Sequence, residues 1–202
     1  MTEVQQVSDL PPRQALDTRT RILDTAEQLV RTRGYYGFSY ADIADRIGIS
    51  KPSIHHHFKT KEDLGKSLIL TTRDKMEGEL ARAPDRSALG LLKRYVQFFE
   101  QSIEGKLICL CGMLIAEDDG LPEQLRATNR DFVDWQLDWI ENLLAKGRDA
   151  GEINFEGAPR ELASFIYSTV QGAHVLAKFQ NDLPGFKRTM NQLLARLACA
   201  QT

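Results

Sequence analysis

The sequence lacks the features that mark membrane proteins and secreted proteins. No apolar run approaches the roughly 20 residues that a membrane-spanning helix needs. The amino-terminal stretch MTEVQQVSDLPPRQ has no apolar centre of the kind found in signal peptides. Among 202 residues there are only three cysteines, which are too few for a disulfide framework and fit a reducing compartment. We therefore expect a cytoplasmic protein.

Common catalytic signatures are missing as well. The chain contains no P-loop, no dinucleotide-binding glycine fingerprint, no His-Glu-x-x-His pair and no nucleophile elbow. We expect no enzyme activity, no cofactor and no metal ion. A small helical enzyme or ligand carrier remains the alternative interpretation, because absent motifs exclude little.

Charge is distributed unevenly along a chain whose net charge is only −2. Residues 13–75 contain 12 lysines and arginines against 8 acidic residues, whereas residues 76–202 contain 14 against 18. The basic amino-terminal part and the acidic carboxy-terminal part indicate that only the amino-terminal part contacts a polyanion.

Apolar residues recur at helical spacing throughout, and no stretch alternates with period two for long enough to predict a strand. The sequence predicts an all-α fold of about nine helices. The first expected helix begins at Thr18 and ends before Gly34. The other eight cover about 40–47, 51–57, 60–82, 85–104, 107–118, 122–150, 159–181 and 184–199.

Two short helices joined by a tight turn are expected near residues 39–58. Ser39 and Asp42 are spaced as a capping box, and Gly48 allows the positive φ of the turn. Ser50 is placed to cap the second helix. Five apolar side chains can pack between the two helices: Ile43, Ile47, Ile49, Ile54 and Phe58. This pattern is typical of a helix-turn-helix.

The segment SKPSIHHHFKTK within this unit holds three of the four histidines. Consecutive helical residues point about 100° apart, so His55, His56 and His57 cannot converge on one metal ion. We expect Lys51, Ser53, His55 and His56 to face outward, with His57 at the edge. An exposed helix of this composition suits the major groove of DNA, whereas a merely solvated polar face is the plainer alternative.

Residues 20–69 resemble the DNA-binding domain of the TetR family of one-component regulators. The resemblance rests on G-Y-x-G-x-S, I-A-x-x-x-G-I-S-K-x-S-I and H-F-x-x-K, in this order after a first helix. Family members commonly carry tyrosine where this chain has His55. Together with the outward-facing His56, the implied DNA-contacting residues are Ser39, Tyr40, Lys51, Pro52, Ser53, His55, His57 and Lys61.

The resemblance also implies a domain organisation and a function. Residues 1–17 would form a flexible arm, residues 18–65 the DNA-binding domain, and residues 66–202 a ligand-binding and dimerisation domain. The implied function is a ligand-responsive transcriptional regulator, most often a repressor, which binds a palindromic operator as a homodimer. An adaptor that has lost DNA binding is a further alternative.

Apolar stripes in the back half predict the partner surface and the effector pocket. Two helices from each subunit would form the dimer interface, through Phe165, Thr169, Gly172, Ala173, Leu176, Leu193 and Leu197. A small-molecule effector, which the resemblance implies, would lie in the helical core against Phe98, Phe99, Cys109, Met113, Trp135, Trp139 and His174. Ordinary core packing is the alternative for each of these side chains.

The segment CLCGMLIAED resembles the C-L-x-x-x-L-x-A-E pattern of electrophile-responsive family members and aligns Cys109 with their sensing cysteine. On a continuous helix Cys109 and Cys111 would point about 200° apart, too far to share one ion. Lys106 is the only cation nearby in the sequence. A small buried core residue is the plainer interpretation of each cysteine.

Overall fold

The computed structural model describes residues 12–197, with side chains from residue 17 onward. This part of the chain is all-α and contains nine α-helices, one short 3-10 helix and no strand. The elements are α2 (Pro12–Arg33), α3 (Tyr40–Ile47), α4 (Lys51–His57), α5 (Lys61–Ala81), α6 (Ala88–Glu104), α7 (Leu110–Ala116), η1 (Asp118–Gly120), α8 (Glu123–Asp149), α9 (Pro159–Gln180) and α10 (Leu183–Ala195). The expected fold class is confirmed.

Several helical ends differ from the expectation, and two of these differences bear on the predicted sites. The first helix begins at Pro12, six residues before Thr18. Proline is compatible with the first turn of a helix, because the N–H that it lacks has no helical partner there. The expected arm therefore overlaps α2, and its residues 1–11 lie outside the described part. Helix α7 begins at Leu110 rather than at residue 107, which leaves Cys109 ahead of the helix.

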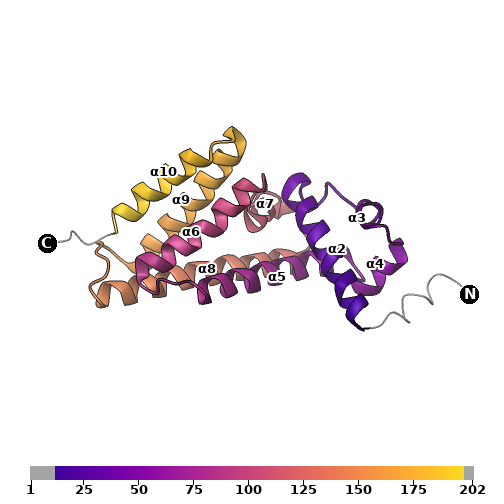
Figure 1. The fold of residues 1–202 in the computed structure, drawn as a ribbon, viewed down its shortest axis with the longest axis horizontal. Coiled ribbons are helices and arrows are strands. Elements are labelled where there is room, and N and C mark those ends of the chain that lie inside the picture. The colour runs from indigo at the N-terminus through magenta and orange to yellow at the C-terminus, as the bar shows by residue number, and fades with distance from the viewer. Residues whose placement is uncertain (1–11, 198–202) are drawn as a thin grey trace, which may run out of the picture.

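The helices form a small unit and an elongated bundle (Figure 1). Helices α2, α3 and α4 lie at one end, while α5, α6, α8, α9 and α10 run along the rest of the molecule. Helix α8 packs on α5 and α9, and α10 packs on α6 and α9. The short α7 contacts both α2 and α8, so it joins the small unit to the bundle.

The small unit is a helix-turn-helix whose local signals match the sequence. Asp42 accepts a hydrogen bond from the Ser39 backbone N–H at 2.8 Å and completes the capping box of α3. Gly48 ends α3 with φ 69°, and the Ser50 side chain caps α4. Arg21 on α2 donates to the Ile47 carbonyl at 2.7 Å, which satisfies one open carbonyl at the end of α3.

A continuous apolar core runs from the small unit into the bundle. Ile43, Ile54 and Phe58 are buried against α2, and Ile47 and Ile49 are partly buried beside them. These side chains fix α4 relative to α3. Over residues 12–197, no helix is long and apolar enough to cross a membrane.

Candidate functional site

Helix α4 has one inward face and one outward face. Ser53, Ile54 and Phe58 are buried and His57 is partly buried, so positions 53, 54, 57 and 58 face inward. Positions 51, 52, 55 and 56 point outward, and all four side chains are exposed: Lys51, Pro52, His55 and His56. The outward face thus carries a cation and two imidazoles on a helix that the core holds in place.

Two predicted DNA contacts are buried. Ser53 is buried, because it lies on the inward face next to Ile54. Tyr40 is also buried, and its hydroxyl donates to the Phe58 carbonyl at 3.0 Å. Burial raises the pKa of Tyr40 well above its usual value. The expectation that Ser53 faces outward is wrong. Tyr40 supports the site from the core, through its hydrogen bond to the residue that follows α4.

His55 is held by neighbours on two sides. Its ring meets the Tyr40 ring edge-on with 4.8 Å between centroids, and its Nδ1 lies 3.3 Å from the Lys59 carbonyl. His57 is partly buried, and this burial, followed by the charges of His56 and Arg19, lowers its pKa.

An open hollow of about 410 Å³ lies beside the outward face. Lys61 forms one wall, where its ammonium donates to the Phe38 carbonyl and lies 4.0 Å from the centre of the Phe38 ring. Burial lowers the pKa of Lys61. The hollow is lined by Phe38, Ser39, Tyr40, Ala41, Lys51, His55 and Lys61. Four predicted DNA contacts besides Tyr40 therefore adjoin one concave surface.

A pair of thiols occupies the place where α7 begins. Cys109 precedes the helix, with φ −58° and ψ 132°, and Cys111 lies in its first turn. Their sulfurs are 3.1 Å apart. The expectation that the two side chains diverge by about 200° is wrong, because it assumed that Cys109 is helical. Cys111 is buried, whereas Cys109 is partly exposed.

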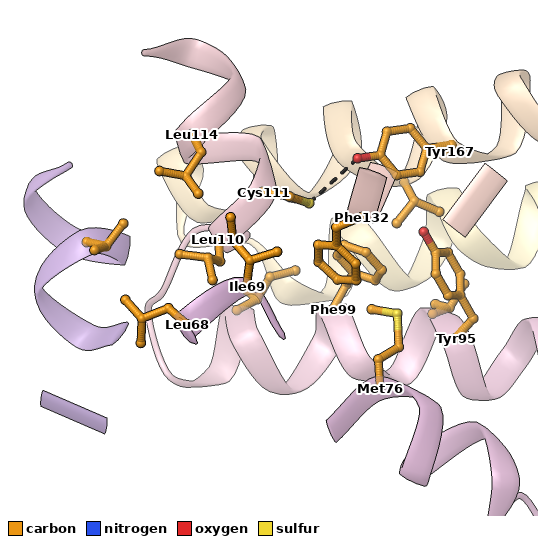
Figure 2. Close-up of a cluster of buried hydrophobic side chains, with 14 of the residues drawn as sticks. Leu68, Ile69, Met76, Tyr95, Phe99, Leu110, Cys111, Leu114, Phe132 and Tyr167 are labelled. Carbon is orange, nitrogen blue, oxygen red and sulfur yellow. Dashed lines mark hydrogen bonds between the residues drawn. The ribbon is translucent and has the colours of Figure 1, made fainter. Parts of the chain in front are cut away.

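Polar side chains approach both sulfurs within an apolar core. The Cys111 sulfur is 3.6 Å from the Tyr167 hydroxyl, and the close-up shows the rings of Phe99 and Phe132 below this sulfur in the view (Figure 2). The Gln136 amide lies 3.8 Å from the same sulfur. The Gln171 amide donates toward Cys109 at 3.5 Å. Neither glutamine belongs to a motif that the sequence could reveal.

The two thiols have opposite pKa shifts. A hydrogen bond from Cys111, assisted by the Gly112 backbone N–H and Gln171, lowers the pKa of the Cys109 thiol to about 6. The positive charge of Arg31 contributes in the same direction. The hydrogen bond to Cys109 and burial both raise the pKa of Cys111 well above its usual value. Of the two thiols, Cys109 therefore loses its proton more readily, and Cys111 holds its proton more tightly.

The predicted effector pocket is only partly assembled. Phe98, Phe99 and Cys109 line a cavity of about 10 Å³, which has room for roughly one water molecule. Met113 is partly buried against the core and does not line this cavity. Trp135 and Trp139 instead line shallow hollows between α5, α6 and α8. These two tryptophans are therefore not part of the cavity.

His174 is fully buried between aromatic rings. Its ring centroid lies 5.8 Å from that of Phe99 and 6.4 Å from that of Phe186. Within the described residues, neither ring nitrogen has a hydrogen-bond partner. Burial, with a smaller contribution from Arg31, lowers the pKa of His174 to about 4. The ring is therefore neutral at pH 7.

The predicted dimer residues separate into two groups. Phe165 and Leu176 on α9 are 52% and 54% exposed, and Val175 and Phe179 extend the same apolar surface. Gly172 leaves open space on this helix, and Thr169 and Ala173 are partly buried. Leu193 and Leu197 are buried in the core of their own chain, so the expectation that they face a partner is wrong.

Comparisons with known proteins agree with this architecture. The family model "Bacterial regulatory proteins, tetR family" matches residues 22–68, and the model "Tetracyclin repressor-like, C-terminal domain" matches residues 88–193. The HTH-type transcriptional repressor NemR of Escherichia coli is 25% identical over 172 residues, which cover 82% of this chain and 86% of NemR.

Solved structures give the same result. A TetR-family transcriptional regulator from Agrobacterium tumefaciens matches with a TM-score of 0.86 at 30% identity, covering 92% of this chain and 100% of the other. The reduced form of NemR from Escherichia coli has the same fold, with a TM-score of 0.76 at 22% identity over 92% of this chain and 100% of that one.

The chain therefore belongs to the TetR family and is a transcriptional regulator with an amino-terminal helix-turn-helix. Regulators of this family bind DNA and act as dimers, and they are not enzymes.

Proposed function

We propose that this protein is a transcriptional repressor that binds a palindromic operator as a homodimer and leaves it when an effector acts on the core. The outward face of α4 carries the proposal, because it presents Lys51, Pro52, His55 and His56 above a buried clamp. Such a short helix contacts only a few base pairs. A cytoplasmic location follows from this role.

The roles of the outward residues follow from their chemistry. Lys51, at the first position of α4, suits a backbone phosphate, because the helix amino-terminus favours anions and lysine adds a full charge. Pro52 offers an apolar surface to a thymine methyl. His55 and His56 suit base edges or phosphates, and Ser39 and Lys61 border the hollow next to them. His57 is partly buried at the edge of this face, and its contact with DNA stays a prediction.

The exposed apolar face of α9 is the proposed dimer surface. Phe165, Leu176 and Phe179 lie on one side of the helix and would be hydrated in a monomer. A symmetric pairing of this face places two α4 helices on one DNA duplex. Half-sites one helical turn apart, about 34 Å, would then follow from the two-fold axis. Residues 18–65 would be the DNA-binding domain, and residues 66–202 would supply the pairing and the effector site.

Cys109 is the proposed point of action of a reactive electrophile. Its thiolate is the nucleophilic form of cysteine, and its side chain is partly exposed. The adjoining cavity is nearly filled, so a group added to the sulfur must displace its neighbours. A displaced Cys109 would also move Ile108, the residue before it. The Ile108 carbonyl accepts a hydrogen bond from Arg31 of α2, so the displacement would reach α2.

Selection of genomic fragments on the purified, reduced protein tests the proposal. We expect recovery of a two-fold symmetric sequence, retarded in gels by a dimer, and release of this DNA when an alkylating reagent modifies Cys109. The Cys109→Ser variant should bind the same DNA and should keep it when the reagent is added. No retention of any fragment in dilute buffer would contradict the proposal and would favour the adaptor or the carrier.

A further inference from the structure

The sulfurs of Cys109 and Cys111 are closer than packing alone requires. A disulfide bond has a length of about 2.05 Å, so an approach of about 1 Å from the observed 3.1 Å would join them. The local backbone makes this possible, because Cys109 is extended while Leu110 and Cys111 have entered the helix. The start of α7 thus folds the two side chains toward each other.

We propose that Cys111 is a resolving thiol for Cys109, and that a hydroperoxide converts the pair into a disulfide within one chain. This inference deepens the proposed function, because it adds a two-electron oxidant to the reagents that act on the same site. It also assigns a role to Cys111, which the alignment with electrophile-responsive proteins leaves without one.

The reaction proceeds in two steps. The Cys109 thiolate attacks one oxygen of the hydroperoxide, a sulfur–oxygen bond forms, and the oxygen–oxygen bond breaks. Sulfur loses two electrons to the peroxide, whose other oxygen leaves as an alcohol or water after taking a proton from solvent. Cys109 becomes a sulfenic acid. The Cys111 sulfur then attacks the Cys109 sulfur, and the hydroxyl group leaves with the Cys111 proton as water.

The positions of the two thiols assign these roles. Cys109 precedes the helix and keeps part of its surface exposed, whereas Cys111 is buried, so Cys109 is the more accessible of the two to an oxidant. The thiolate character of Cys109 favours the first step, and Cys111 retains the proton that the second step needs. Cys111 is already in contact with the sulfur that it must attack.

A disulfide would alter contacts that link the core to α2. It would remove the thiolate charge near Arg31, and it would draw Cys111 away from Tyr167 and Gln136. Helix α7 packs on both α2 and α8, so a shift of its first turn is transmitted to the small unit. Oxidation should therefore weaken DNA binding.

Intact-mass measurement with thiol trapping tests the inference. Cys199 lies outside the described residues, and a Cys199→Ser background prevents it from contributing. Each protein is treated with hydrogen peroxide in small excess, then denatured and alkylated. We expect the parent to lose two hydrogen atoms and to resist alkylation. Because Lys106 and Arg126 bound one tryptic peptide that contains both cysteines, the linkage can be mapped within it.

Two variants separate the steps. Cys111→Ser, which keeps a hydrogen-bond donor beside Cys109, should stop at a sulfenic acid on Cys109 that dimedone traps. Cys109→Ser should show neither product. The inference fails if the parent accumulates a sulfenic or sulfinic acid at Cys109 while Cys111 remains open to alkylation, or if disulfides form only between chains.

DNA binding by the reduced protein is measured in the same samples. If the reduced protein retains DNA but peroxide forms no disulfide, the inference fails and the proposed repressor function stands. If the disulfide forms but the reduced protein retains no DNA, the proposed function fails and the thiol chemistry stands.

Discussion

The Arg31 guanidinium donates a hydrogen bond from Nε to the backbone carbonyl of Ile108 at 2.7 Å. Arg31 belongs to α2, and Ile108 immediately precedes Cys109. The guanidinium also pairs with Glu27 at 2.7 Å and is largely buried. One side chain therefore joins the first helix of the DNA-binding unit to the backbone that positions the thiols.

Replacement of Arg31 by methionine should raise the pKa of Cys109, because a positive charge near the thiolate is lost. The pH dependence of iodoacetamide labelling at Cys109 measures this change. Arg33→Met, on the same helical turn but paired with Asp42, is the matched control and should leave the labelling curve in place. Equal curves for the parent and Arg31→Met would show that the guanidinium does not act on the thiol.

His174 should make the protein less stable in mild acid. Its pKa is about 6.5 in the unfolded chain and about 4 in the folded one, so the unfolded state binds the proton more readily. Stability from the neutral ring is complete above pH 6.5 and is lost as the pH falls toward 4. At pH 5 the loss is about 2 kcal/mol.

Urea unfolding of the parent and of His174→Phe at pH 7 and pH 5 tests this linkage. Phenylalanine keeps a ring between Phe99 and Phe186 and cannot titrate. The free energy of unfolding should fall by about 2 kcal/mol less in the variant than in the parent. The same pH dependence in both proteins would assign the acid sensitivity to other groups.

The α9 face should control assembly. Leu176→Asp places a charge on this surface and should shift the protein toward monomers in sedimentation equilibrium. Leu70→Asp is the matched control, because Leu70 is 52% exposed but lies on α5. If Leu176→Asp dimerises with the affinity of the parent, or if both variants dissociate equally, α9 does not form the interface.

Some of the site could be predicted from helical spacing and some could not. The capping residues and the turn glycine predicted the helix-turn-helix correctly, because Ser39, Gly48 and Ser50 occupy the cap positions expected of them. The spacing of Ile54 and Phe58 does not place Ser53 on the inward face, because at about 100° per residue Ser53 lies about 100° from Ile54 and about 140° from Phe58. The burial of Ser53 depends on how α4 packs on the rest of the chain, which helical spacing does not specify.

Other features had no signal along the chain. Helix α7 starts after a cysteine whose side chain makes no capping hydrogen bond, so nothing marked its first residue. Gln136 and Gln171 meet the sulfurs from two separate helices. An apolar stripe does not distinguish a core from an interface, and Leu193 and Leu176 have the same side chain but opposite positions.

The salt dependence of operator binding tests most directly whether the outward face of α4 contacts DNA. If Lys51 neutralises one phosphate in each subunit, Lys51→Ala should make the slope of log K against log salt shallower by about 1.8. Lys93→Ala, an exposed lysine on α6 in the bundle, should leave the slope unchanged. A Lys51→Ala protein with the parent's slope and affinity would contradict the assignment of α4 as the DNA-reading helix.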